Sequence, residues 1–217
     1  MGEQGHIGSA HAIQTTCKWA EKKSRVPGSA IDRAFLAVEQ IAAKATKTTL
    51  NRSLELAGLK RIPTVGQTRW DTKRQQVKAV CEAYDHIATM DVVEDITAFS
   101  ETSKDDLLNL LKELDYVSSK RKLFEKVAPV GHLVQPTYWK LKTRIKDAKK
   151  AVGKQWNRAM ASVIDMKAGK GTGKRTCFGE IIDDIHLVQS FLNPLYKDLA
   201  KIGVSRKKAD RNSLFGR

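Results

Sequence analysis

Apolar side chains recur every three or four residues along most of this 217-residue chain, and this spacing constrains the fold more than any other feature. A three-to-four spacing places side chains on one face of an α-helix, whereas a strand would need strict alternation. Strand-like alternation is absent wherever the pattern can be read. The sequence therefore predicts a mainly α-helical fold, an irregular helical bundle with little or no complete sheet, in which amphipathic stripes pack together.

In the N-terminal half, a short helix is predicted over residues 10–22, followed by a break at Pro27 and Gly28. Ser29 is the expected N-cap of the next helix. That helix is predicted to continue through residues 46–57, with three inward positions at Leu50, Leu54 and Ala57.

After a connection at 58–66, helical spacing predicts a helix from Trp70 to Ile87. Residues 91–99 are short and ambiguous. Ser103 is the expected cap of a long helix that ends at Pro129.

The C-terminal half begins with a strongly basic helical stretch at 134–166, in which Gly153 is a candidate kink or boundary. A Gly- and Lys-rich loop at 167–175 and a helix at 178–192 follow. Pro194 ends that helix, and the segment from Ser205 has no clear pattern.

Charge narrows the class of partner. Lys and Arg number 39 against 24 Asp and Glu, which leaves a formal net charge of +15. An excess of this size favours a polyanion, either nucleic acid or an acidic membrane surface, and a solvated basic surface is the alternative. No apolar run approaches the ~20 residues of a membrane span. We therefore expect a soluble protein without a membrane span, whose partner is a polyanion and not a small-molecule substrate.

Metal and catalytic sites are not predicted. Cys17, Cys81 and Cys177 lie far apart without Cys-x-x-Cys spacing, so the sequence indicates neither a disulfide framework nor a zinc site. The acidic pairs at 105–106 and 183–184 lie in helical patterns, where acids in a first turn or between buried side chains have structural roles. The sequence predicts no catalytic residue, no metal ligand and no cofactor in this chain.

Two features are candidates for contact with DNA. Arg69 and Trp70 lie side by side at a helix start, where a guanidinium can hold a phosphate while an indole stacks on an unpaired base. Trp70 also fits the apolar face of its helix, so a place in the core is the alternative. The second candidate is a basic face that consists of Lys140, Lys142, Arg144, Lys149, Lys150, Lys154 and Arg158.

Four ordered motifs resemble hAT-type DNA transposases. Residues 67–72 have the sequence Gln-Thr-Arg-Trp-Asp-Thr and resemble the family's Thr-Arg-Trp-Asn-Ser-Thr, with Asp71 and Thr72 in place of Asn and Ser. Residues 131–142 resemble Ile-His-Leu-Val-x-Pro-x-Tyr-x-Lys-Leu-Lys, and residues 191–199 resemble Phe-Leu-(Asp/His)-Pro-Arg-Tyr-Lys-x-Leu. Upstream, residues 8–14 resemble the start of Cys-x-x-His-x-Leu-Gln-Leu, although Gly8 stands at the Cys position.

The resemblance implies a particular place in a larger enzyme. In the family, a helical domain is inserted into an RNase H-like core between the second and third magnesium-binding carboxylates. Residues 1–28 would then be a diverged remnant of the core edge and its linker, 29–202 the insertion domain, and 203–217 a basic tail. Magnesium belongs to the full-length family enzyme, dimerisation would use regions absent from this chain, and the location would be nuclear.

The hypothesis from the sequence is thus a transposase fragment that contacts transposon-end DNA but lacks the catalytic acidic triad, and that is inactive alone. The resemblance carries over a functional role only for Arg69 and Trp70. Two alternatives stay open: a domesticated basic helical module that binds nucleic acid, and an interaction protein without catalysis.

Overall fold

The computed structural model describes residues 4–63, 70–125 and 131–167. This part of the chain is mainly helical and contains no strand, which confirms the prediction of a mainly α fold. Correspondence to a transposase insertion domain remains a prediction. The expected loop at 167–175, the helix at 178–192, Cys177 and the acidic pair at 183–184 lie almost wholly or wholly outside the described residues.

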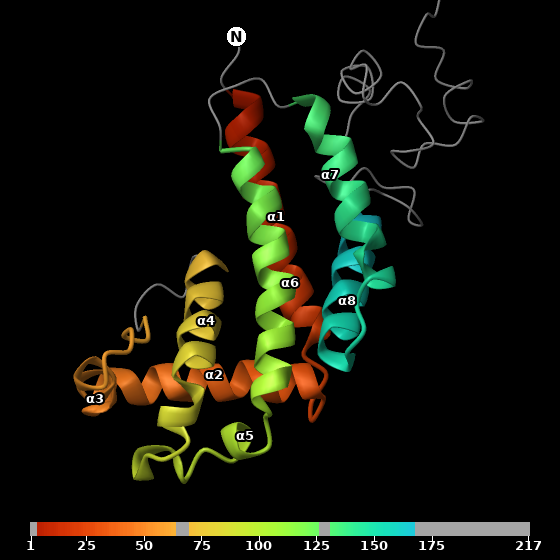
Figure 1. Cartoon of the computed structure of the whole chain (residues 1–217). Coiled ribbons are helices and arrows are strands. Elements are labelled where there is room, and N and C mark those ends of the chain that lie inside the picture. The colour runs from red at the N-terminus through yellow and green to blue at the C-terminus, as the bar shows by residue number, and fades with distance from the viewer. Residues whose placement is uncertain (1–3, 64–69, 126–130, 168–217) are drawn as a thin grey trace, which may run out of the picture.

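Most of the long helices run up and down the molecule, and one crosses near their lower ends (Figure 1). The upright helices are α1 (Gln4–Ser24), α4 (Trp70–Ile87), α6 (Lys104–Leu123), α7 (Gly131–Thr143) and α8 (Ala151–Lys167), and the crossing helix is α2 (Ala30–Lys47). Helix α4 packs along α6. The shorter elements are α3 (Leu50–Leu56), η1 (Asp91–Val93), α5 (Thr97–Ser100) and η2 (Arg144–Lys146).

Side-chain caps fix where α2 and α6 begin. The Ser29 hydroxyl accepts a hydrogen bond from the Asp32 backbone N–H, and the Ser103 hydroxyl accepts one from that of Asp106. Each bond satisfies a backbone donor that has no partner within its helix. Gly28, with φ +74°, supplies the left-handed backbone that turns the chain from α1 into α2. Both predicted caps are confirmed.

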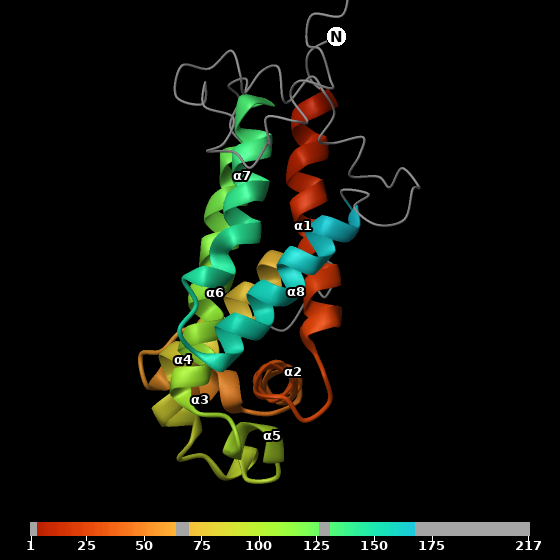
Figure 2. The ribbon, with the colours of Figure 1, turned by 90° about the vertical axis from the view of Figure 1, so that its right-hand side faces the viewer.

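The core lies where α2 meets the upright helices. Ile31, Phe35, Val38 and Ile41 of α2 are all fully buried, as their spacing predicts. The Phe35 ring centroid lies 6.3 Å from that of Trp156, which is also fully buried. Helix α1 contributes Ile13 and Cys17 to the same hydrophobic core and packs against α8 (Figure 2).

The prediction that one helix continues through residues 46–57 is wrong. Helix α2 ends at Lys47 instead of continuing through 46–57: the backbone of Thr48 is extended, and the Asn51 side chain donates back to the Ala45 carbonyl near the end of α2. Leu50 and Leu54 are buried as predicted, whereas Ala57 is exposed.

The basic stretch at 134–166 is broken at residues 147–150, before Gly153, which lies buried inside α8. A Cβ added at Gly153 would lie 3.5 Å from the Cβ of Ala148 and from the Cγ of Glu113. The glycine therefore marks close packing against α6 and not a kink.

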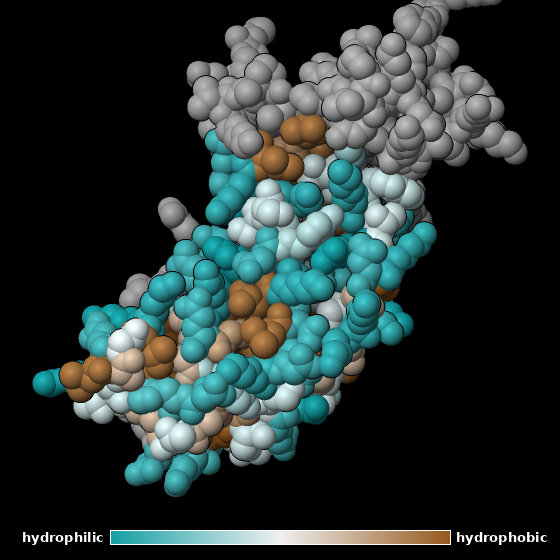
Figure 3. All heavy atoms as spheres, viewed as in Figure 1, coloured by the Kyte–Doolittle hydropathy of each residue, from teal (hydrophilic) through white to brown (hydrophobic). Residues whose placement is uncertain are grey.

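One end of α1 and one end of α6 also differ from the predicted ends. Helix α1 begins at Gln4, earlier than residue 10, and α6 ends at Leu123, ahead of Pro129. None of the helices in the described ranges has the length and apolar character that a membrane crossing needs. Over α4 and α6, hydrophobic side chains form only small patches among hydrophilic ones (Figure 3).

Candidate nucleic-acid interface

Trp70 is the first residue of α4 and belongs to the core, as the alternative interpretation of the sequence had it. Its side chain is 7% exposed, and Trp156 of α8 stacks on it with ring centroids 6.5 Å apart and an interplanar angle of 23°. A base could stack on Trp70 only after α4 and α8 had separated. Arg69, its predicted partner, lies outside the described residues.

Asp71, the acid beside this pair, is neutralised by the fold. Its carboxylate lies 3.1 Å from Nε of Arg74 and 3.7 Å from Nη2 of Arg121. Asp71 also occupies the first turn of α4, where a negative charge is favourable. The negative charge of Asp71 is therefore largely balanced at this point.

Three of the seven residues in the predicted basic face are paired with acids. Lys142 of α7 bonds Asp165 of α8, and Nζ of Lys150 lies 2.6 Å from Asp105. Arg144 of η2 donates to Glu113 of α6 over 3.0 Å. These pairs link elements to one another, so their first role is structural.

Glu113 is the centre of one of these links. Its side chain is 5% exposed, and it accepts from the Nδ2 group of Asn157 over 3.1 Å as well as from Arg144. A buried carboxylate needs such partners because desolvation otherwise disfavours its charge. Helices α6 and α8 and the turn η2 are therefore held together by one buried acid.

The other four members of the predicted basic face are Lys140, Lys149, Lys154 and Arg158. All four are exposed, and none forms an ion pair with any residue that the structure describes. Lys154 and Arg158 lie four residues apart on α8, so their side chains are neighbours on one face. These exposed cations can interact with an external polyanion.

Sequence reasoning missed a contribution from α6. Nζ of Lys120 lies 5.0 Å from the centroid of the Tyr116 ring, and Cζ of Arg144 lies 4.2 Å from the same centroid. Burial, and then the positive charges of Lys140 and Arg144, lower the pKa of Lys120. We call Tyr116, Lys120, Lys140 and Arg144 the Tyr116 cluster.

The spacing of Tyr116 and Lys120 was the signal in the sequence that could have indicated this contact. Tyr116 and Lys120 are four residues apart and therefore adjacent on one helical face, but Lys120 lies in the basic last turn of α6. Cations in a last turn ordinarily interact with the helix dipole, which hides a second role. The approach of α7 and η2 to α6 could not be read from the spacing of residues.

Within the described ranges, no three His, Cys, Asp or Glu side chains are arranged to hold a metal ion. Asp105 and Asp106 lie in the first turn of α6, as predicted. Cys17 and Cys81 are buried in the core.

Comparison with known proteins leaves the origin of the chain open. No family model, no curated protein and no solved structure matches it.

Proposed function

We propose that this chain binds DNA through the Tyr116 cluster and the exposed cations of α8, as a non-catalytic, DNA-contacting part of a hAT-like transposase. The observation that carries DNA binding is the cluster itself. Lys120 of α6 and Arg144 of η2 lie over one aromatic ring, and the positive charge of Lys140 acts on Lys120 from α7. Like charges brought together cost stability, and a bound phosphate would offset that cost.

Charge elsewhere on the chain supports a polyanionic partner. The net charge of +15 steers polyanions toward the molecule, and Lys154 and Arg158 add adjacent cations on α8. Each phosphate that a Lys or Arg neutralises releases counterions, so the affinity should fall steeply with salt. Helices α7 and α8 lie on the same side of the molecule (Figure 2), which would let one ligand contact both.

The transposase lineage rests on the four ordered motifs, with a mainly helical fold in agreement. In this proposal the acids of the chain take no part in chemistry, and magnesium is bound by the full-length enzyme elsewhere. Nuclear location follows from the same proposal. The burial of Trp70 moves the proposed DNA contact away from the Arg69–Trp70 pair, because its ring is covered by Trp156.

A salt titration of binding tests the proposal. We expect a labelled 20-base-pair duplex to bind at low salt, and the substitutions Lys120→Gln and Lys140→Gln together to weaken binding about tenfold and to flatten the salt dependence. Lys47→Gln with Arg52→Gln removes the same charge from exposed positions on α2 and α3, at the far end of the molecule (Figure 1), and should change little.

Three outcomes would contradict parts of the proposal. Absence of duplex binding at low salt would exclude DNA binding and favour an interaction protein. Equal weakening by the control pair would show that only net charge matters. Robust cleavage of hairpin or nicked DNA with magnesium by this chain alone would exclude a non-catalytic role.

A further inference from the structure

Trp19 of α1 has the surface position that the sequence had suggested for Trp70. Its side chain is 48% exposed with respect to the described residues. Single exposed apolar side chains are common on proteins and carry no argument alone. What distinguishes Trp19 is its setting, since Lys18, Lys22 and Lys23 are exposed on the same half of α1.

Two of these lysines have defined contacts. Nζ of Lys22 lies 5.9 Å from the centroid of the Trp19 ring. Lys23, one helical turn after Trp19, donates from Nζ to the Ser162 hydroxyl of α8 over 2.6 Å. The aromatic surface of α1 is therefore joined to α8 through Lys23.

The contact continues into the exposed cations of α8. Arg158 and Lys154 precede Ser162 by four and eight residues, so all three lie along one face of the helix. Helices α1 and α8 run in opposite directions (Figures 1 and 2), so this row extends away from Trp19. We call Trp19, Lys22, Lys23, Arg158 and Lys154 the α1/α8 track, whose part along α8, from Ser162 to Lys154, is about 12 Å long at 1.5 Å per residue.

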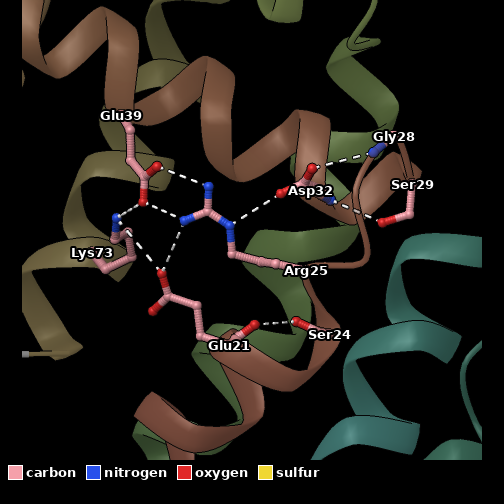
Figure 4. A network of polar contacts seen from close by, with 8 residues as sticks. All are labelled: Glu21, Ser24, Arg25, Gly28, Ser29, Asp32, Glu39 and Lys73. Atoms are coloured by element: carbon pink, nitrogen blue, oxygen red, sulfur yellow. Dashed lines mark hydrogen bonds and ion pairs between the residues drawn. The ribbon is translucent and has the colours of Figure 1, made fainter.

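The nearest acid of α1 is turned away from this track. Glu21, the one acid in the sequence of α1, lies within a network with Arg25 and Lys73 that connects α1 to α2 and α4 (Figure 4). Asp165 of α8 is bonded to Lys142. The track therefore combines one aromatic ring with cations whose charge is not balanced by these acids.

We propose that the α1/α8 track binds unpaired DNA, with Trp19 stacking on a base while Lys22, Lys23, Arg158 and Lys154 contact the phosphates. An exposed indole flanked by cations suits a single strand, because every unpaired base offers a ring face. A duplex offers phosphates to the cations but keeps its bases stacked on each other. The inference rests on the proposed DNA binding and adds the kind of DNA that this surface selects.

The test compares a labelled ten-nucleotide oligothymidylate with a duplex of equal length. Trp19→Ala should weaken binding to the single strand about fivefold or more and leave duplex binding within twofold. Trp19→Phe should restore most of the lost affinity, because it keeps a ring for stacking. Leu56→Ala, at another exposed apolar side chain, is the matched control and should change neither affinity.

The outcomes separate this inference from the proposed function. If Trp19→Ala weakens single-strand and duplex binding equally, or weakens neither while the duplex still binds, the track is not selective and only this inference fails. If the unsubstituted chain binds neither probe at low salt, the proposed DNA binding fails as well. Selective loss with Trp19→Ala and recovery with Trp19→Phe support both.

Discussion

Two arginines, each beside an aromatic ring, lie in opposite electrostatic surroundings. Cζ of Arg25 lies 5.8 Å from the centroid of Phe35, and three carboxylates contact its guanidinium, from Glu21, Asp32 and Glu39. Lys73 bonds the same Glu39. This network, which Figure 4 shows, joins α1, α2 and α4.

Arg144 lies over Tyr116 with a different set of neighbours. Glu113 and Asp147 pair with it, but Lys120 and Lys140 add two further positive charges nearby. The Arg25 network has more acids than bases, whereas the Tyr116 cluster has more bases than acids. The comparison teaches that cations enclosed by acids mark a joint between helices, and an excess of positive charge marks a surface available to an anion.

The largest expected effect comes from the link that holds Arg144 in place. Glu113→Ala should lower the free energy of unfolding by about 3 kcal/mol, because it removes the buried acceptor that Arg144 and Asn157 share. Urea unfolding measures the change. A loss below about 1 kcal/mol would mean that Glu113 does not organise the cluster. Glu55→Ala is the control, because Glu55 is an exposed acid of α3 whose carboxylate lies 3.5 Å from Nε of the exposed Arg61.

The Arg25 network should respond to pH in two opposite ways. Hydrogen bonds from Arg25 and Lys73 outweigh burial and hold the pKa of Glu39 below 4.5, whereas burial raises the pKa of Glu21. Ionised Glu39 therefore stabilises the fold above pH 4.5, and this stability is lost as the pH falls through its lowered pKa. Glu21 instead gains stability when it is protonated, as the pH falls through its raised pKa.

Single substitutions separate these two contributions. Glu39→Gln should lower the free energy of unfolding at pH 7 by about 1 kcal/mol and flatten its decline below pH 4.5. Glu21→Gln should leave stability at pH 7 unchanged or slightly higher. Unfolding curves at several pH values measure both, and a larger loss from Glu21→Gln than from Glu39→Gln would reverse our assignment.

A smaller effect is expected where α8 packs against Glu113. Gly153→Ala should raise the free energy of unfolding by about 0.5–1 kcal/mol, since alanine is the better helix former. The added Cβ would meet Ala148 and Glu113 at 3.5 Å, an ordinary contact. Thermal unfolding measures the gain. Destabilisation would show that the region beside the cluster has no room for one methyl group.

The smallest effect on stability concerns the cluster itself. Lys140→Gln removes one of the charges that lower the pKa of Lys120, so that pKa should rise toward 10.5. Because folded Lys120 binds fewer protons than in the unfolded chain, stability rises with pH between its lowered pKa and 10.5, and the variant should show a smaller rise. The gain at pH 7 should be only about 0.3 kcal/mol. NMR titration of the Lys120 side chain measures the shift, and an unchanged pKa would separate Lys140 from the cluster.

Local features of the fold could be predicted from the sequence, and long-range ones could not. The caps at Ser29 and Ser103 and the buried face of α2 follow from residues within one turn of each other. The packing of the connection after α3 could not be predicted, because it depends on the Asn51 side chain binding the backbone of Ile62, eleven residues away. The prediction of a kink or boundary at Gly153 was wrong for the same reason, since its neighbour Glu113 is forty residues away in the chain.

In the candidate site, too, the sequence predicts local features and not those that depend on long-range packing. The basic character of 140–158 was evident, but spacing could not tell the paired Lys142 and Lys150 from the exposed Lys154 and Arg158. The exposure of Trp19 and the burial of Trp70 depend on where α8 lies, which no local pattern encodes.

The rate at which Cys81 reacts with an alkylating reagent can report on opening of the core. Its thiol is buried in α4, and burial is the main reason that its pKa is raised to about 12. Only a thiolate reacts quickly with alkylating reagents, so the folded state should be inert near neutral pH. The rate of labelling at this sulfur would then report how often α4 detaches from its neighbours, which is the motion that would also uncover Trp70.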